Sequence, residues 1–363
     1  MSSMEAKPNI LWICTDQQRY DTIGILGNPH IRTPNIDRLV EKGTAFLNAY
    51  CQTPICTPSR ASFLTGMYPS TVHACLNGND YWSDAAPLLP YMLSDSGYDC
   101  GLVGKLHLAG TYNRYEPRKN DGYRYFKWSS SPIDMWEKGH DYADWLKKKG
   151  YSLKDFATLP NGDKYIDIEP GIPGPLHQTP WGAEEAIHFI EKEAKRPWLL
   201  SVNPYDPHPP FNPPKEYLDR FDIDKMPGPH FRESDMANQE RLGKVDFQTF
   251  VKHPDEFNGK AIQAAYYAMI ELIDENVGRI VAALEKSGEI ENTIIIFMSD
   301  HGESLGDHGL VLKGCRFYDE LTRVPLIISW PAKFKQNLRC PALVQLNDIM
   351  PTLLQSCGMD IPE

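Results

Sequence analysis

Two short polar clusters each follow directly after an apolar run, and both contain groups that bind metal ions. They are Asp16-Gln17 near the N-terminus and Asp300-His301 much later in the chain. Carboxylate and amide oxygens favour calcium, magnesium or manganese, whereas an imidazole favours manganese or zinc. We therefore expect these four side chains to hold one divalent cation. The alternative is that Asp16 caps a loop and that Asp300-His301-Gly302 forms an ordinary turn.

Cys56 lies in a segment that could activate a nucleophile. Pro58 suits the first turn of a helix that runs through Arg60 and ends at Gly66, which places Cys56 at or just before the helix N-terminus. The partial positive charge at a helix N-terminus lowers the pKa of a thiol and attracts anions. The segment predicts a reactive Cys56 beside Arg60 in a site for an anionic group. The alternative is a buried structural cysteine.

The elements that would position these residues are indicated by near-continuous apolar runs. Such runs occupy residues 9–15, 198–203, 293–299 and 324–330. Strands of this kind are typical of a parallel sheet covered by helices. One helical pattern begins at Thr33-Pro34 and ends at Gly43. A second helical pattern covers residues 261–286. The fold class is therefore α/β, with a large, mostly parallel central sheet flanked by helices. If both acid-bearing strands are central, the two clusters converge at one edge of the sheet.

No internal repeat and no linker divides the chain, so we expect a single domain over residues 1–363. Residues 111–182 and 204–254 lack periodicity, and the second stretch is rich in proline. We interpret both as long loop insertions that shape the substrate pocket. Aromatic residues of the first stretch could stack on sugar rings or pack as a lid: Tyr112, Tyr115, Tyr123, Tyr125, Trp128, Trp136 and Trp145.

Composition excludes several classes of protein. The 363 residues contain 37 Lys and Arg against 48 Asp and Glu, a net charge of −11 that disfavours nucleic acid as a partner. No apolar run approaches the roughly 20 residues that cross a bilayer. The eight cysteines show no C-x-x-C pair, which argues against a disulfide scaffold or a structural zinc site. The polar N-terminus predicts a cytoplasmic protein, or a periplasmic or secreted one if a leader has been removed.

Several motifs occur in an order that is similar to that of one known family. The motifs are Cys56-Thr57-Pro58-Ser59-Arg60 with Leu64-Thr65-Gly66, residues 8–17, residues 101–107 (GLVGKLH), residues 207–211 (PHPPF), residues 299–309 (SDHGESLGDHG) and Lys313-Gly314. Together they resemble the type I sulfatases, the formylglycine-dependent members of the alkaline phosphatase superfamily. The likeness covers residues 8–356, which we take as the core of the domain.

The resemblance implies a role for each matched residue. Cys56 would be oxidised by a formylglycine-generating enzyme, and the hydrate of its aldehyde would attack sulfur with one hydroxyl on the metal. Arg60 would stabilise the hydrate or the metal ligands, and Lys105 and Lys313 would clamp the sulfate oxygens. His107 would be the base for the second hydroxyl. His208, alone or with Lys313, would protonate the leaving alcohol. Asn77 occupies a position where related enzymes keep an amide that contacts the substrate.

Three departures from the family pattern bear on these expectations. Gln17 and His301 replace an aspartate and an asparagine, so Ca²⁺ remains the expected ion while Mn²⁺ becomes an alternative. Gln and His at these positions also resemble the phosphonate and phosphodiester hydrolases, although those relatives tend to replace the Lys105-x-His107 pair. Finally, the small antiparallel C-terminal subdomain of the family is expected to be missing or abbreviated, because the sequence ends at Glu363.

The sequence therefore predicts an enzyme that hydrolyses sulfate esters carried by a sugar. The substrate would be a sulfated small molecule or glycan. One alternative is a phosphonate monoester or phosphodiester hydrolase of the same superfamily. A second is a sulfated-glycan binder in which the site survives without turnover.

Overall fold

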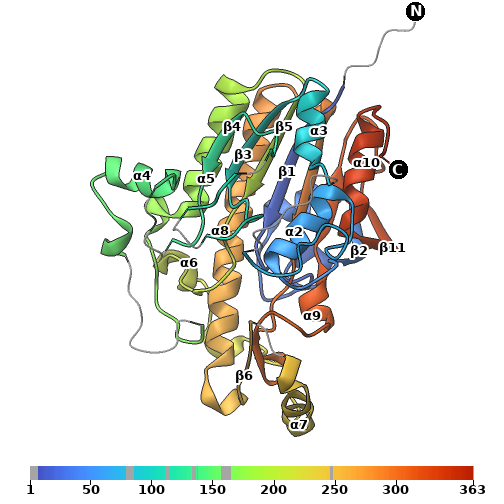
Figure 1. The fold of residues 1–363 in the computed structure, drawn as a ribbon. Helices are drawn as coiled ribbons and strands as arrows, with labels where there is room; N and C mark the ends of the chain where they lie inside the picture. Colours follow the sequence, from blue (N-terminus) through green and yellow to red (C-terminus); the bar gives the residue numbers. More distant parts are fainter. Residues whose placement is uncertain are drawn as a thin grey trace, which may run out of the picture.

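The computed structural model describes residues 7–78, 86–111, 115–118, 120–132, 136, 138–156, 165–245 and 248–362. Within them, nine strands form one sheet in the order β11-β2-β10-β7-β1-β5-β3-β4, with β9 paired to β2 (Figure 1). The strands are β1 (Asn9–Thr15), β2 (Thr44–Tyr50), β3 (Asp99–Gly104), β4 (Tyr125–Trp128), β5 (Trp198–Asn203), β7 (Thr293–Ser299), β9 (Arg323–Val324), β10 (Leu326–Ser329) and β11 (Leu338–Gln345).

Most neighbouring strands in the sheet are parallel. β1 is parallel to both β5 and β7, β3 is parallel to β4 and β5, and β11 is parallel to β2. Only β9 and β10 run antiparallel to their described neighbours. This arrangement confirms the predicted α/β fold with a mostly parallel sheet. Every residue of β1 is buried, because Ile10 and Trp12 pack on one face of the sheet while Leu11 and Ile13 pack on the other.

Helices cover both faces of the sheet (Figure 1). One face is packed by α1 (Pro34–Glu41), α5 (Gln178–His188) and the long α8 (Gly259–Lys286). The other is packed by α2 (Cys56–Thr65), α3 (Leu89–Asp95) and α10 (Ile349–Ser356). Of the described helices, none is long and apolar enough to cross a membrane.

Helix α2 begins at Cys56 and ends at Gly66, as the sequence predicts. Gly66 has φ +70°, the left-handed conformation that terminates helices and favours glycine. Every residue of α2 is buried, so the helix is held on all sides and its first turn is fixed. Cys56 therefore lies at the N-terminus of a rigid element that points towards the carboxyl ends of the strands.

The two long segments contain more regular structure than the expected loops. The first holds β4 and α4 (Asp141–Lys148), and its last residues begin α5. The second holds α6 (Lys215–Leu218), α7 (Glu233–Leu242) and β6 (Thr249–Val251). β6 pairs antiparallel with β8 (Leu310–Leu312) as a separate two-stranded ribbon, and the short α9 (Asp319–Thr322) follows. Apart from α5, these elements are only three to ten residues long, which explains why periodicity did not reveal them.

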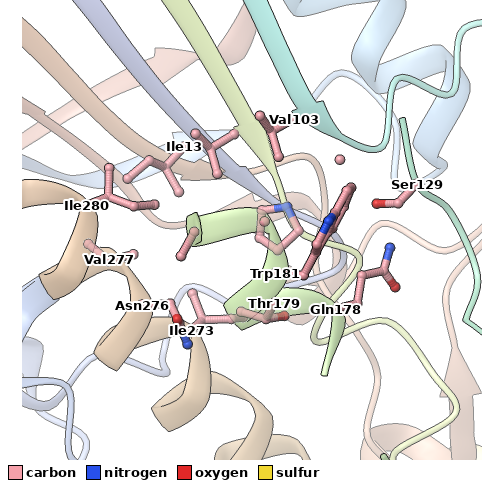
Figure 2. Close-up of a pocket in the computed structure, with 15 residues that line it drawn as sticks. Ile13, Val103, Ser129, Gln178, Thr179, Trp181, Ile273, Asn276, Val277 and Ile280 are labelled. Carbon is pink, nitrogen blue, oxygen red and sulfur yellow. The ribbon is translucent and has the colours of Figure 1, made fainter. Parts of the chain in front are cut away.

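A small cavity lies between the sheet and the helices α5 and α8 (Figure 2). Ile13 and Val103 contribute from the strands, Trp181 from α5 and Ile273 from α8. Its volume of about 30 Å³ holds no more than a water molecule or two, and its described lining carries no charged side chain. This cavity is part of the packed core, and the larger pocket described below is a separate feature.

Candidate active site

The site is built at the carboxyl ends of four adjacent parallel strands, β7, β1, β5 and β3. Thr15 and Ser299 are paired in register, so Asp16 and Asp300 leave β1 and β7 side by side. The backbone N–H of Asp300 donates to the carbonyl oxygen of Thr15 at 3.2 Å. Lys105 directly follows β3. The two acidic clusters predicted to converge therefore lie together.

Four potential metal ligands meet beside the N-terminus of α2. The ligand atoms of Asp16, Cys56, Asp300 and His301 all lie within 4.8 Å of one another, and all four residues are buried. The Cys56 Sγ lies 3.1 Å from His301 Nε2 and 3.6 Å from Asp16 Oδ1. His301 Nδ1 lies 2.9 Å from the Gly302 carbonyl oxygen, which requires an N–H there and leaves Nε2 as the ligand atom.

Gln17, the fifth expected ligand, borders this cluster through its amide. Its Oε1 accepts from Lys313 Nζ at 2.6 Å, and its Nε2 donates to the carboxylate of Glu303. The two partners fix the orientation of the amide, because an ammonium can only donate and a carboxylate accepts. Glu303 is fully buried and was not singled out from the sequence. It belongs to the motif at residues 299–309, but nothing in the spacing shows that it contacts Gln17.

Three cationic side chains surround Cys56 and the carboxylates. Lys313 Nζ lies 3.1 Å and Lys105 Nζ lies 3.8 Å from the Cys56 Sγ. Lys105 also forms an ion pair with Asp16. Arg60 lies one turn along α2, and its Nε donates to Asp300 Oδ2 at 2.9 Å. Arg60 thus contacts the carboxylates, whereas both lysines reach Cys56 itself.

These contacts shift the protonation of the buried groups. Burial alone would raise the pKa of the Cys56 thiol, but Lys105, Lys313 and His301 outweigh it and hold that pKa well below its usual range. Burial and the neighbouring Asp16 raise the pKa of Asp300. Two carboxylates this close repel each other, and a divalent cation would offset that repulsion. The two carboxylates, with the His301 nitrogen and Cys56 beside them, therefore fit a divalent metal ion.

The remaining predicted residues lie around a larger cavity that also borders Cys56, Lys105 and Lys313. His107 lines it, and its buried Nδ1 has no hydrogen-bond partner among the described residues. His208 Nδ1 lies 2.7 Å from the carbonyl oxygen of Pro209. Burial, with Lys313 and Lys105 nearby, holds the pKa of His208 well below its usual value. Asn77 Oδ1 accepts from the backbone N–H of Thr57 at 3.0 Å, which places Asn77 at the first turn of α2.

From Cys56 a cavity of about 710 Å³ opens towards the surface. Of the aromatic residues expected from the first long segment, Trp136 lines this cavity. Tyr123, Tyr125 and Trp128 are instead buried in the hydrophobic core, and Tyr112 lies outside the described residues. The cavity is also lined by Tyr165, Gln248 and Phe250, which carried no recognisable motif.

Comparison with known proteins assigns the chain to a family. The model of the sulfatase family matches residues 8–359. An arylsulfatase of Clostridium perfringens is 34% identical over 98% of this chain and 76% of its own length. A mouse iduronate 2-sulfatase is 32% identical over 90% of this chain, which spans 60% of that relative. The crystal structure of a phosphonate monoester hydrolase of Agrobacterium radiobacter superposes with a TM-score of 0.81 and 27% identity, over 98% of this chain and 74% of that one.

The fold and the site define a hydrolase of the alkaline phosphatase superfamily. Within it, the chain belongs to the sulfatase family and is a sulfuric ester hydrolase. This membership confirms the resemblance on which the sequence analysis relied.

Proposed function

We propose that the protein hydrolyses sulfate esters carried by a carbohydrate, using an oxidised Cys56 and one divalent cation. One observation carries this proposal: the Cys56 Sγ lies within 4 Å of Asp16, His301, Lys105 and Lys313 at the start of a buried helix. An anionic ester that reaches Cys56 meets two lysines on one side and the predicted metal ligands on the other. The iduronate 2-sulfatase relative acts on a sulfated sugar acid, which supports a carbohydrate as the alcohol.

The chain's own residues would bind and orient the sulfate group. Lys105 and Lys313 approach Cys56 from separate elements, so their ammonium groups can contact different sulfate oxygens. Negative charge grows on the ester during S–O cleavage, and fixed cations in a buried site stabilise it far better than mobile ones in water. Arg60 would act indirectly, because its guanidinium holds Asp300 and thereby fixes a metal ligand.

The family implies two groups, a cation and a formylglycine, and residues of this chain could supply a site for each. Asp16, Asp300, His301 and the amide of Gln17 would hold the cation, which would supply Lewis-acid stabilisation of charge at the sulfate. Oxidation of Cys56 to formylglycine would supply the nucleophilic hydroxyl. We propose Ca²⁺ as the ion, because the other ligand atoms are oxygens. Mn²⁺ is the alternative, because His301 adds a nitrogen ligand.

Two histidines would handle protons. His107 carries a buried Nδ1 in the cavity wall that has no hydrogen-bond partner within the part of the chain that the structure describes, and such a ring nitrogen suits a base. His208 donates from Nδ1 to Pro209, so its Nε2 is the ring atom that can exchange a proton with the leaving alcohol. The low pKa of His208 means that it must gain a proton before it can act as the acid. An anionic sulfate between the two lysines would offset their charge and raise the pKa of His208 again.

The proposal is tested by producing the chain with a formylglycine-generating enzyme. We expect mass spectrometry of the Cys56 peptide to show conversion of cysteine to formylglycine, and the converted protein to release sulfate from 4-nitrophenyl sulfate. Protein made without the maturation enzyme is the control and should be inactive. Retention of an unmodified thiol at position 56 in the presence of that enzyme would contradict the proposal.

A second candidate function is hydrolysis of phosphonate monoesters or phosphodiesters. The structural similarity to the Agrobacterium phosphonate monoester hydrolase favours it. The chain keeps the Lys105-x-His107 pair that such relatives tend to replace, which favours the sulfate ester that we propose first. Comparing kcat/KM on 4-nitrophenyl sulfate and 4-nitrophenyl phenylphosphonate separates the two functions. A higher value on the phosphonate would reverse our assignment.

A further inference from the structure

The outer part of the active-site cavity has a chemistry distinct from its base. Lys105 and Lys313 are the only Lys, Arg, Asp or Glu among its described lining residues, and both contact Cys56. Further out the described lining is neutral and partly aromatic, with Trp136, Tyr165 and Phe250. The alcohol half of an ester whose sulfate lies at Cys56 would occupy this neutral part.

Gln248 and Phe250, two residues of this outer part, are held in a fixed position relative to Lys313. Phe250 is on β6 and pairs with Val311 of β8, a strand that ends at Leu312, directly before Lys313. The hydroxyl of Thr249 donates to the carbonyl oxygen of Lys313 at 2.7 Å. The β6–β8 ribbon therefore fixes residues 248–250 relative to the lysine that lies 3.1 Å from Cys56.

A chain of hydrogen bonds sets the orientation of Gln248. The backbone N–H of Thr57 donates to Asn77 Oδ1 at 3.0 Å, so the amide nitrogen of Asn77 faces outward. That nitrogen donates to Gln248 Oε1 at 2.9 Å. Because a backbone N–H can only donate, it determines which atom is oxygen and which is nitrogen in both side-chain amides. Gln248 thus presents its Nε2 as a hydrogen-bond donor at the cavity wall.

Aromatic rings flank this donor. Tyr165 and Phe250 stack with their ring centroids 5.5 Å apart and their planes 27° apart, and 44% of Phe250 remains exposed. Trp136 is immobilised in another part of the wall, where its Nε1 donates to the Ser131 carbonyl oxygen at 2.8 Å and its ring stacks on His140. Rigid aromatic faces bind flat apolar surfaces with little loss of conformational entropy.

We propose that Gln248 and Phe250 form the subsite for the alcohol half of the substrate, and that this half is an uncharged sugar ring. The apolar face of the ring lies on the Phe250–Tyr165 pair, and a ring hydroxyl accepts from Gln248 Nε2. A plain aryl group would use only the aromatic face, whereas a sugar uses the face and the amide together. This inference rests on the proposed function, because the sulfate at Cys56 determines where the ring lies.

Three variants test the subsite. Phe250→Ala removes the ring face, and Gln248→Glu keeps an acceptor for Asn77 while removing the donor. Val251→Ala is the matched control, because its side chain points to the other face of β6 and does not line the cavity. Each variant is assayed on galactose 6-sulfate, N-acetylglucosamine 6-sulfate, 4-nitrophenyl sulfate and ethyl sulfate. The kcat/KM on each of the first three esters is divided by the kcat/KM on ethyl sulfate, and each ratio is compared with that of the wild-type protein.

We expect Phe250→Ala to lower the sugar-to-ethyl ratio about three- to tenfold, a change that corresponds to one aromatic contact. Gln248→Glu should lower the sugar ratio but not the nitrophenyl ratio, since any effect of its charge on sulfate binding cancels in the ratio. Val251→Ala should leave every ratio unchanged. Ratios that stay constant in both subsite variants would overturn the inference.

Failure of the subsite and failure of the proposed function are distinguishable. If the wild-type protein releases sulfate from none of the esters, the proposed function fails. Calorimetry then measures binding of the two sugar sulfates to the metal-loaded protein with Cys56→Ala, with and without Phe250→Ala. Weaker binding in the double variant supports the subsite, and equal binding overturns it.

Discussion

Several interactions of the site meet at the side chain of Cys56. Its sulfur contacts His301, Lys105 and Lys313. We expect Cys56→Ala to abolish release of sulfate while destabilising the fold by only about 1–2 kcal/mol, because a single buried atom is lost. Activity assays and thermal unfolding of the same preparation measure both effects.

The matched control is Cys51→Ala. Cys51 is also buried, but burial raises the pKa of its thiol, and its Sγ lies 3.8 Å from the backbone carbonyl oxygen of Leu321. This variant should keep full activity. Appreciable turnover by Cys56→Ala would remove Cys56 from the mechanism.

His208 predicts a specific pH dependence. Only its protonated form can act as an acid, so the rate on an alkyl sulfate should fall as pH rises through the pKa of His208. Burial and the nearby Lys313 hold that pKa well below 6.5 in the free protein, so the fall in kcat/KM should be complete below neutral pH. In kcat the same fall should occur at higher pH, because bound sulfate offsets the charge of the lysines.

The substitution His208→Gln should remove this limb of the pH profile. It should also lower the rate on alkyl sulfates far more than on 4-nitrophenyl sulfate, because nitrophenolate leaves without a proton. The measurement is a pair of pH–rate profiles, one for each leaving group. Equal losses on both substrates would refute the acid role.

At the scale of elements, the end of β3 determines the position of Lys105. Gly104 has φ +107°, and a Cβ there would lie 2.0 Å from the carbonyl oxygen of Asn203. That same carbonyl accepts from the backbone N–H of Lys105 at 2.9 Å. Gly104→Ala should therefore move Lys105, reduce kcat/KM and destabilise the protein by about 1–3 kcal/mol beyond the cost of the backbone strain.

Gly97→Ala separates the cost of a side chain at a positive φ from the cost of a steric clash. Gly97 also has a positive φ, +94°, but a Cβ there would meet nothing within 4 Å. The Gly97→Ala variant should have a free energy of unfolding about 1 kcal/mol lower than the wild-type protein and should keep its activity. Chemical denaturation and kinetics on both variants make the comparison, and equal behaviour would show that the contact with Asn203 is unimportant.

The elements also show which features the sequence could reveal. β1 and β7 have the bounds predicted for them, because strands covered on both faces consist almost entirely of apolar residues. β6 was not predicted, since it has three residues and two of them are exposed. Phe250 on this ribbon and Gln248 directly before it therefore had no signal. Glu303 could be linked to the site only through its contact with Gln17 across the fold.

At the scale of the whole molecule, the site depends on the complete sheet. The predicted metal ligands follow β1 and β7. The cationic side chains come from α2, the end of β3 and the segment after β8, and His208 follows β5. The residues of the site span positions 16–313, so no single segment of the chain carries them. Binding at the site should therefore be linked to the stability of the entire fold.

Metal removal provides the test of this linkage. A cation that binds the folded chain and not the unfolded chain adds about 2.7 kcal/mol of stability at a free concentration 100 times its Kd. We expect a chelator to lower the melting temperature of the purified protein, and added Ca²⁺ or Mn²⁺ to restore it. Asp300→Asn should lower the metal content and remove most of this difference, because Asp300 is a fully buried carboxylate within the ligand cluster. Exposed Asp95→Asn on α3 is the control and should melt with the wild-type difference. The opposite result is a protein that is shown to lose its metal while its melting temperature does not respond to the chelator. That result would mean that the cation does not stabilise the fold and affects catalysis alone.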